Sequence, residues 1–344
     1  MSVTNRYFLA ANGFLGFRCH FGSLLKSEDI KKLDIIKGGS GVGKSTLMRR
    51  ISAYFSDAGF SVEEILCSSD PSSLDGVVIN SSGGRIVLID GTAPHEYDMK
   101  YPAMRDITVD LSKHLNEREL EKHGAKIKRL IKEKKKCYDT AYKNLHLAGI
   151  SYKAILETTM PYARSIEIKN LAKKLFPDEN TRAEKLDLKL YSAFCKEGLI
   201  LLDRNDEQYK KAYYFDSGYK THILFSQLYV EIKKRGYDIT VFPSPFSDDI
   251  IDGFSVNDEV LFKIRDSAPT YKSDYYFDNF DGRDGEIINS YEKIFNLSLE
   301  AAKQSLKWAF ENHRSLEEIY GSHMDFEKNT RLSEDLIDKI KLEL

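Results

Sequence analysis

The pattern of apolar and polar positions in the N-terminal part of the chain predicts strands and one helix in alternation. Short apolar runs at 33–36, 61–67 and 85–90 have the length and composition of buried strands. Residues 46–55 carry apolar side chains at helical spacing, and Gly59 marks the end of that helix. Strands that alternate with helices are typical of a doubly wound, mostly parallel sheet. We therefore expect an α/β fold whose ligand lies at the carboxyl ends of the strands.

The pattern changes at about residue 110, where long, charged, helix-periodic sequence with few glycines begins. It predicts antiparallel helices that stand off the sheet as an insertion. The most basic stretch, 126–136, keeps Ile127, Leu130 and Ile131 on one apolar edge. A solvated helix face explains this stretch better than a nucleic-acid or lipid patch, because no aromatic residue is interleaved with the basic ones.

The second half of the chain resembles the first in several short segments that follow one another in the same order. The matched segments are 59–62 with 236–239, 74–76 with 251–253, and 92–94 with 267–269. Repetition at a nearly constant offset predicts a tandem duplication. The expected organisation is a core over 1–109, a helical insertion over 110–185, a degenerate copy of the core over 186–280 and a C-terminal helical segment over 281–344.

A glycine-rich motif lies between the first predicted strand and the helix. Gly38-Gly39-Ser40-Gly41-Val42-Gly43-Lys44-Ser45 fits the phosphate-loop pattern G-x-x-x-x-G-K-[ST] in its strand-loop-helix context. Glycines let consecutive backbone N–H groups and the helix dipole point at one anion. The sequence therefore predicts a P-loop NTPase that binds a nucleoside triphosphate. The residues expected to bind the nucleotide are Gly38, Gly39, Ser40, Gly41, Val42, Gly43, Lys44, Ser45 and Thr46.

Two residues are expected to hold Mg²⁺. The Ser45 hydroxyl follows the phosphate-binding Lys44, and Asp90 ends an apolar strand in the arrangement called Walker B. Hydrolysis also needs a group that orients water, but the residue after Asp90 is Gly91 instead of a glutamate. The nearest substitutes are His95, which is equally interpretable as a structural residue, and Glu96, with Asp70 on the neighbouring strand. The candidate catalytic residues are Lys44, Asp90, His95 and Glu96.

The second copy lacks the features of a working site. Its counterpart of the phosphate loop, 214–221, has few glycines and adds Asp216. Aligned on Ser267-Ala268-Pro269, the counterpart of Asp90 is Arg265. We therefore expect the second copy to bind triphosphate poorly.

Composition and net charge limit the kinds of partner that we expect for this chain. The 344 residues suit two domains, and 42% hydrophobic with 30% charged residues is ordinary for a globular protein. A net charge of -2 gives no general attraction to nucleic acid or to an anionic membrane, so we expect neither as a partner. No apolar run has membrane-spanning length and no leader is evident, so a cytoplasmic location is expected. Four scattered cysteines argue against a zinc site. A protein partner or a homo-oligomer is left open.

The segments 37–48, 67–76 and 88–95 carry a wider resemblance. With them the chain resembles, over its whole length, an uncharacterised bacterial family of tandem P-loop ATPases found mostly in Firmicutes. The resemblance implies ATP binding at Gly38 to Thr46 and a metal role for Asp90. In that family each half typically carries its own phosphate loop, and this sequence departs from the pattern in its second half.

Three functions fit these motifs. The first is a slow, Mg²⁺-dependent ATP hydrolase or nucleotide-driven switch. The second is a kinase for a small molecule or nucleotide, with acceptor loops at 68–70 and 75–76, the helical insertion as a lid, and Arg105 or Arg164 on the phosphates. The third is an ATP-sensing interaction module with little turnover. ATP is preferred to GTP because no N-K-x-D motif follows a strand.

Overall fold

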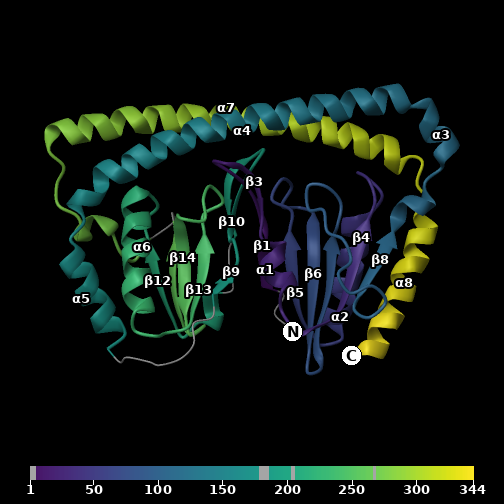
Figure 1. The fold of residues 1–344 in the computed structure, drawn as a ribbon, viewed down its shortest axis with the longest axis horizontal. Coiled ribbons are helices and arrows are strands. Elements are labelled where there is room, and N and C mark those ends of the chain that lie inside the picture. The colour runs from purple at the N-terminus through teal and green to yellow at the C-terminus, as the bar shows by residue number, and fades with distance from the viewer. Residues whose placement is uncertain (1–4, 178–185, 203–205, 266–268) are drawn as a thin grey trace.

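The computed structural model of the chain describes residues 5–177, 186–202, 206–265 and 269–344. Two β-sheets stand side by side beneath a pair of long helices that spans both of them (Figure 1). Each sheet mixes parallel and antiparallel strands, so the fold is α/β in the general sense.

The first sheet has the strand order β1-β5-β6-β7-β4-β8. Its strands are β1 (Asn5–Phe8), β4 (Ile30–Lys37), β5 (Ser61–Leu66), β6 (Leu74–Ser81), β7 (Gly84–Asp90) and β8 (Asp106–Asp110). The predicted strands at 33–36, 61–67 and 85–90 correspond to β4, β5 and β7. β6 is antiparallel to both of its neighbours, whereas β1 pairs with β5, and β4 with β7 and β8, in parallel. The sheet is therefore mixed: five of its six strands run in one direction and β6 alone runs the other way.

β6, like β1 and β8, lies outside the strands that the sequence pattern predicts. Asp75 and Gly76, expected in an acceptor loop, lie near the start of β6 instead, and both are buried. β5, β6 and β7 follow one another as an antiparallel meander, so no crossover helix is needed between them. α2 (Lys44–Asp57) joins the parallel-running strands β4 and β5, and it packs on the sheet through the helically spaced Leu47, Ile51 and Phe55.

The second sheet repeats this arrangement. Its order is β12-β15-β14-β13-β9, and its strands are β9 (Leu186–Leu188), β12 (Lys211–Phe215), β13 (Ile239–Pro243), β14 (Ile251–Val256) and β15 (Val260–Ile264). The directions match those of β4-β7-β6-β5-β1 strand for strand. A register shift also recurs at the same place, between Ile65 and Leu66 in one sheet and between Phe242 and Pro243 in the other. α6 (Tyr219–Lys233) takes the place of α2.

Two β-hairpins fill the space between the sheets. They consist of β2 (Ala10–Gly13) with β3 (Gly16–Cys19), and of β10 (Ser192–Cys195) with β11 (Gly198–Leu201). The Asn12 amide donates a 2.9 Å hydrogen bond to the Phe194 carbonyl, which joins the hairpins. Phe14, at the tip of the first hairpin, stacks on Phe246 of the second half at 5.0 Å. The two halves therefore share a packed boundary.

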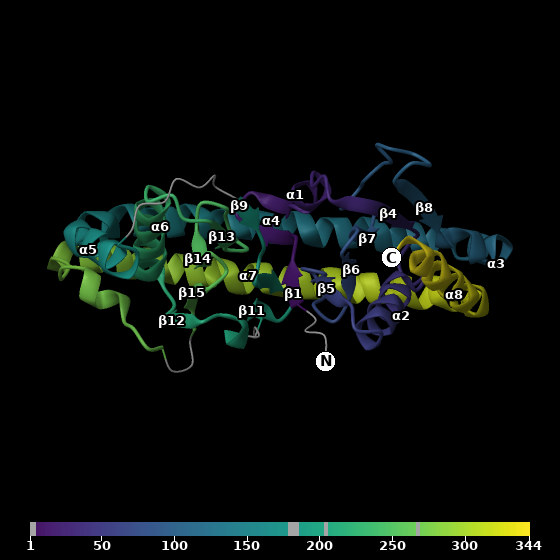
Figure 2. The ribbon, with the colours of Figure 1, turned by 90° about the horizontal axis from the view of Figure 1, so that it is seen from below.

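The long helices are α4 (Gly124–Thr159) and α7 (Gly282–Gly321), and they run antiparallel along the molecule (Figures 1 and 2). The start of α4 packs on the end of α7 through Ile127 and Leu316, among others. The remaining helical elements are α1 (Phe21–Leu25), η1 (Leu111–His114), α3 (Glu117–Lys122), η2 (Met160–Tyr162), α5 (Ser165–Leu175), η3 (Asp206–Gln208), η4 (Ser273–Tyr276) and α8 (Phe326–Glu343).

Each sheet is completed by a helix from the other half of the chain. α5 packs against α6 on the second sheet, where Ile168 and Ala172 enter the core. α8 packs against α2 on the first sheet, where Leu336 and Ile340 enter the core. In Figure 1 the yellow α8 accordingly flanks the purple and blue sheet. α5 and α8 are thus parts of the two sheet cores, whereas α4 and α7 pack on each other and on the hairpins.

Candidate functional site

The glycine-rich loop connects β4 to α2 at the carboxyl end of the first sheet. Gly38, Gly41 and Gly43 have φ angles of +152°, +74° and +89°, in the region that favours glycine. Gly43 is the N-cap of α2, and its carbonyl accepts a 3.0 Å hydrogen bond from the Leu47 N–H. The first N–H groups of a helix have no partner within the helix. The loop therefore delivers backbone donors and the positive end of the α2 dipole to one place.

Lys44 lies inside this loop. Its ammonium donates 2.8 Å hydrogen bonds to the carbonyls of Gly38 and Gly39, and it lies 3.6 Å from the Asp90 carboxylate. Its side chain is largely buried. The loop thus holds the Lys44 ammonium at the carboxyl end of β7, the strand next to β4.

Asp90 faces the loop because β7 pairs with β4 so that Asp90 lies opposite Ile36. Its carboxylate accepts a 2.8 Å bond from the Thr92 N–H, and the Thr92 hydroxyl donates a 3.0 Å bond to the Gly38 carbonyl. Burial raises the pKa of Asp90, the charge of Lys44 opposes that shift, and the Asp75 charge adds to it. Thr92 was missed at the sequence level, although its place two residues after Asp90 is a signal for an Asx turn.

The two residues expected to hold Mg²⁺ come from neighbouring elements. The Ser45 hydroxyl oxygen accepts a 2.9 Å bond from the Leu74 N–H, which ties α2 to β6. No group of three or more His, Cys, Asp or Glu side chains forms a metal site within the described residues. Mg²⁺ commonly takes one or two protein ligands and completes its shell with phosphate and water. A hydroxyl and a carboxylate beside the glycine-rich loop fit that requirement.

His95 is bound to a buried carboxylate. Its Nε2 lies 3.0 Å from Asp75 Oδ2, and its ring packs on those of Phe17 and Phe21. Burial alone would lower the pKa of His95, but Asp75 and Cys19 raise it to about 10. A histidine that keeps its proton at neutral pH is a poor general base. This geometry favours the structural interpretation of His95 over the catalytic one.

The other candidate groups lie apart from the loop or are paired. Glu96 is exposed, as is Thr46. Asp70 accepts a 3.3 Å contact from Lys196, at the tip of the second hairpin, and the Lys196 ammonium lies 3.5 Å from the Phe310 ring centroid. Asp70 is therefore paired with a lysine from the second half of the chain.

The groups proposed for a kinase acceptor site are not gathered at the loop. Asp75 lies in β6 and contacts His95. Arg105 pairs with the adjacent Asp106 at 2.6 Å, and Arg164 pairs with Asp278 at 2.8 Å, next to the second sheet. The expectation that these arginines close on the phosphates is not supported, because each is held by a local carboxylate.

The C-terminal helices cover the loop. A Cβ on Gly41 would lie 2.5 Å from the Glu317 carbonyl oxygen of α7, so the α7 backbone touches the loop directly. His313 Nδ1 lies 3.3 Å from the Ser40 hydroxyl. The Asn329 amide of α8 donates a 2.7 Å bond to the carbonyl of Val42, whose side chain is fully buried. These partners could not be inferred from the sequence, because they lie more than 250 residues from the loop.

The equivalent connection in the second sheet is shorter. Three residues, 216–218, separate β12 from α6, whereas six residues, 38–43, separate β4 from α2. The Asp216 carboxylate accepts a 2.8 Å bond from the Ser273 N–H. Lys220 pairs with Asp274 at 2.6 Å. Asp216 and Lys220 near this connection are therefore each held by a partner, Ser273 and Asp274 respectively.

The strand register corrects the counterpart of Asp90. Ile264 lies opposite Phe215 as Asp90 lies opposite Ile36. The Arg265 N–H donates to the Phe215 carbonyl, as the Gly91 N–H donates to the Ile36 carbonyl. Ile264 is thus the counterpart of Asp90, and Arg265 corresponds to Gly91. The sequence alignment was off by one because it was anchored on Ser267-Ala268-Pro269, of which Ser267 and Ala268 lie outside the described residues.

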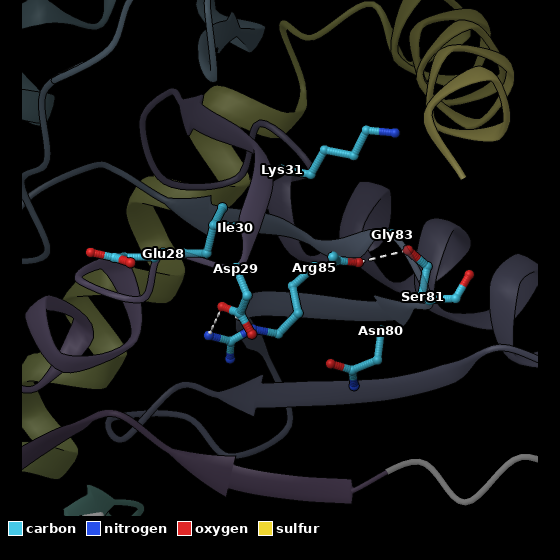
Figure 3. Close-up of a pocket in the computed structure, with 10 residues that line it drawn as sticks. Glu28, Asp29, Ile30, Lys31, Asn80, Ser81, Gly83 and Arg85 are labelled. Atoms are coloured by element: carbon cyan, nitrogen blue, oxygen red, sulfur yellow. Dashed lines mark hydrogen bonds and ion pairs between the residues drawn. The ribbon is translucent and has the colours of Figure 1, made fainter.

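A separate shallow pocket lies at the opposite end of β4. Its lining comes from the start of β4 and from the β6–β7 turn (Figure 3). Figure 3 shows the Asp29 carboxylate joined to the Arg85 guanidinium, at 2.6 Å, so these charges satisfy each other. Ile30 begins the strand that Lys37 ends next to the glycine loop. This pocket is therefore remote from the loop, and the charges of Asp29 and Arg85 in it are paired with each other.

Comparisons with known proteins identify no relative of this chain. No protein-family model matches the chain, and neither a curated protein nor a solved structure is significantly similar to it. None of the helices that the structure describes has the length and apolar character to cross a membrane.

Proposed function

We propose that this chain binds ATP with Mg²⁺ at Gly38 to Thr46 and acts as a slow ATP hydrolase or a nucleotide-driven switch. The proposal includes a P-loop NTPase fold, duplicated in tandem, with a degenerate second copy. The observation that supports it is the loop between β4 and α2. Its glycines have positive φ angles, and Lys44 lies between the loop carbonyls and Asp90.

Each group of the loop has a chemical role in this proposal. The N–H groups at the start of α2 bind phosphate oxygens, and Lys44 neutralises the β- and γ-phosphates. Ser45 and Asp90 hold the Mg²⁺ that bridges those phosphates. Bound Mg²⁺ supplies charge neutralisation for transfer of the γ-phosphoryl group.

Slow turnover follows from the groups around the loop. His95 is held as a cation by Asp75, and Asp70 is paired with Lys196, so neither is a free base for water. A nucleotide that binds but turns over slowly suits a switch. The elements that would respond are α7 and α8, because Glu317, His313 and Asn329 contact the loop.

The test is nucleotide binding followed by thermal unfolding. With ATP and Mg²⁺ at about a hundred times the dissociation constant, the native state gains about 2.7 kcal/mol, which raises the melting temperature by several degrees. Lys44→Ala should abolish this gain. Asp90→Asn should keep metal-free binding but lose the additional gain from Mg²⁺, because its role is to hold the ion.

Lys220→Ala is the matched control, since Lys220 pairs with Asp274 near the second connection. It should leave the nucleotide-dependent gain unchanged. Release of phosphate from ATP without any acceptor separates a hydrolase from a pure switch. An ATP response that persists in Lys44→Ala would refute the assignment of the loop.

A further inference from the structure

From Ile127 to Tyr152, one face of α4 is lined by aliphatic and aromatic residues except at Lys134. The residues on this inner face recur at spacings of three and four, as expected of a helix that packs along another helix. They are Ile127, Leu130, Lys134, Tyr138, Ala141, Leu145, Ala148 and Tyr152. Apart from Lys134 and Tyr138, all of them are buried in the hydrophobic cores. A lysine at such a position carries a desolvation cost that a ligand can offset.

The inner face of α4 points at the carboxyl end of the first sheet. One turn after Lys134, the Tyr138 hydroxyl donates a 3.3 Å bond to Ser69, in the loop that follows β5. One turn before Lys134, Leu130 packs with Leu316 and Ile319 of α7. Lys134 therefore projects between two contacts that fix α4 over this edge.

The phosphate loop lies under the same part of the helix pair. Between Leu316 and Ile319, the backbone of Glu317 touches Gly41. One turn earlier on α7, His313 contacts Ser40 at 3.3 Å. The α4–α7 pair thus covers the loop directly, with Lys134 on its lower face.

The electrostatics of Lys134 agree with this placement. Burial lowers the pKa of Lys134, the like charge of Lys44 lowers it further, and Glu317 opposes the shift. Lys44 is thus close enough for its charge to act on Lys134. Among the residues that the structure describes, no carboxylate lies within ion-pair distance of the Lys134 ammonium. The like charges of Lys44 and Lys134 repel, and a phosphate group between them would offset that repulsion.

We propose that Lys134 is a phosphate-contacting residue that makes the site selective for nucleoside triphosphates over diphosphates. This inference rests on the proposed function. In this proposal the loop donors and Lys44 bind the phosphates that ATP shares with ADP, Lys44 also contacts the γ-phosphate, and Lys134 reaches that terminal phosphate from α4. At the second connection the ammonium of Lys220 is already paired with Asp274, at 2.6 Å.

The experiment is calorimetric titration of the full chain with Mg²⁺ and either a non-hydrolysable ATP analogue or ADP. A hydrogen bond to a charged group predicts that Lys134→Met weakens binding of the triphosphate by about 10- to 100-fold. Binding of ADP should change by less than about threefold, within the scatter of a surface substitution. Lys134→Arg should keep most of the selectivity, because it keeps the charge. Lys135→Met removes an exposed lysine from the same turn and should change neither affinity.

The outcomes separate this inference from the proposed function. Loss of selectivity for the triphosphate in Lys134→Met, with Lys135→Met unchanged, supports the assignment. Equal weakening of both nucleotides, or no weakening, overturns it while nucleotide binding itself stands. If the unmodified chain binds neither nucleotide, the proposed function fails and this inference fails with it.

Discussion

A buried, unpaired carboxylate in β4 provides a quantitative test of the first sheet. Asp34 is fully buried, and neither of its oxygens has a hydrogen-bond partner within the described part of the chain. Burial raises its pKa to about 6, although the charges of Lys32 and Lys339 oppose the shift. Glu343, near the end of α8, raises the pKa further. Asp34 therefore reports on the packing of α8 against the sheet.

The magnitude follows from linkage between folding and protonation. The ordinary pKa is 3.8 and the folded value is about 6, so the ionised carboxylate costs the native state about 3 kcal/mol. Because the pKa is raised in the folded state, the stability that depends on a protonated Asp34 is fully present below about pH 4. That stability is lost as pH rises through 6, and at pH 5 roughly half of the penalty is present.

The perturbation is Asp34→Asn, which keeps the shape and removes the charge. At pH 8 we expect the variant to be more stable than the unmodified chain by about 1–2 kcal/mol, because the unpaired amide still costs about 1–2 kcal/mol. This advantage should shrink by about 1.5 kcal/mol between pH 8 and pH 5. Urea unfolding at a series of pH values measures both quantities.

Asp29→Asn is the control with the opposite sign. Burial opposes the shift, but hydrogen bonds from Arg85 and Ser27 lower the pKa of Asp29. Its stabilisation is therefore present at neutral pH and lost on acidification, so Asp29→Asn should not gain stability at pH 8. A difference between Asp34→Asn and the unmodified chain that stays constant from pH 5 to pH 8 would refute the account of Asp34.

Two further predictions concern the loop and its copy. Gly41→Ala should lower both the melting temperature and nucleotide affinity, because its Cβ would lie 2.5 Å from the Glu317 carbonyl oxygen. Gly39→Ala, with no neighbour within 4 Å of its Cβ, should be tolerated in the same thermal assay, and equal sensitivity of the two would contradict the close approach of α7. Titration calorimetry should give one nucleotide per chain, unchanged in Lys220→Ala, because only the first connection has the glycine loop; a stoichiometry of two would contradict this.

Local patterns predicted the local elements. The apolar runs of β4, β5 and β7 and the helical spacing of α2 are short-range signals, and each element lies where its pattern placed it. β6 was missed because its first residues, Leu74-Asp75-Gly76, have the composition of a turn. Gly76 is required there for a different reason, since a Cβ would lie 3.0 Å from the Leu88 carbonyl oxygen of the neighbouring strand.

The periodicity of the sequence could not predict which helices cover the glycine loop. The apolar faces of α4, α5, α7 and α8 show that each helix packs on something, but a periodic pattern does not identify its partner. α5 and α8 could each have packed on the sheet of their own half. They pack on the other sheet because α4 and α7 carry the chain across the molecule, as Figure 1 shows.

This exchange determines how the candidate site is built. The loop and Asp90 come from the first half, yet the groups that touch the loop from above belong to α7 and α8, after residue 280. Within the first half, only α4 reaches over the same edge, and α4 is held there by α7. Any movement of the loop must therefore be transmitted to helices that end at the other sheet, because packed helices shift as units. A nucleotide bound at this loop, as proposed, would therefore also affect helices that belong to the other half of the chain, even with slow hydrolysis.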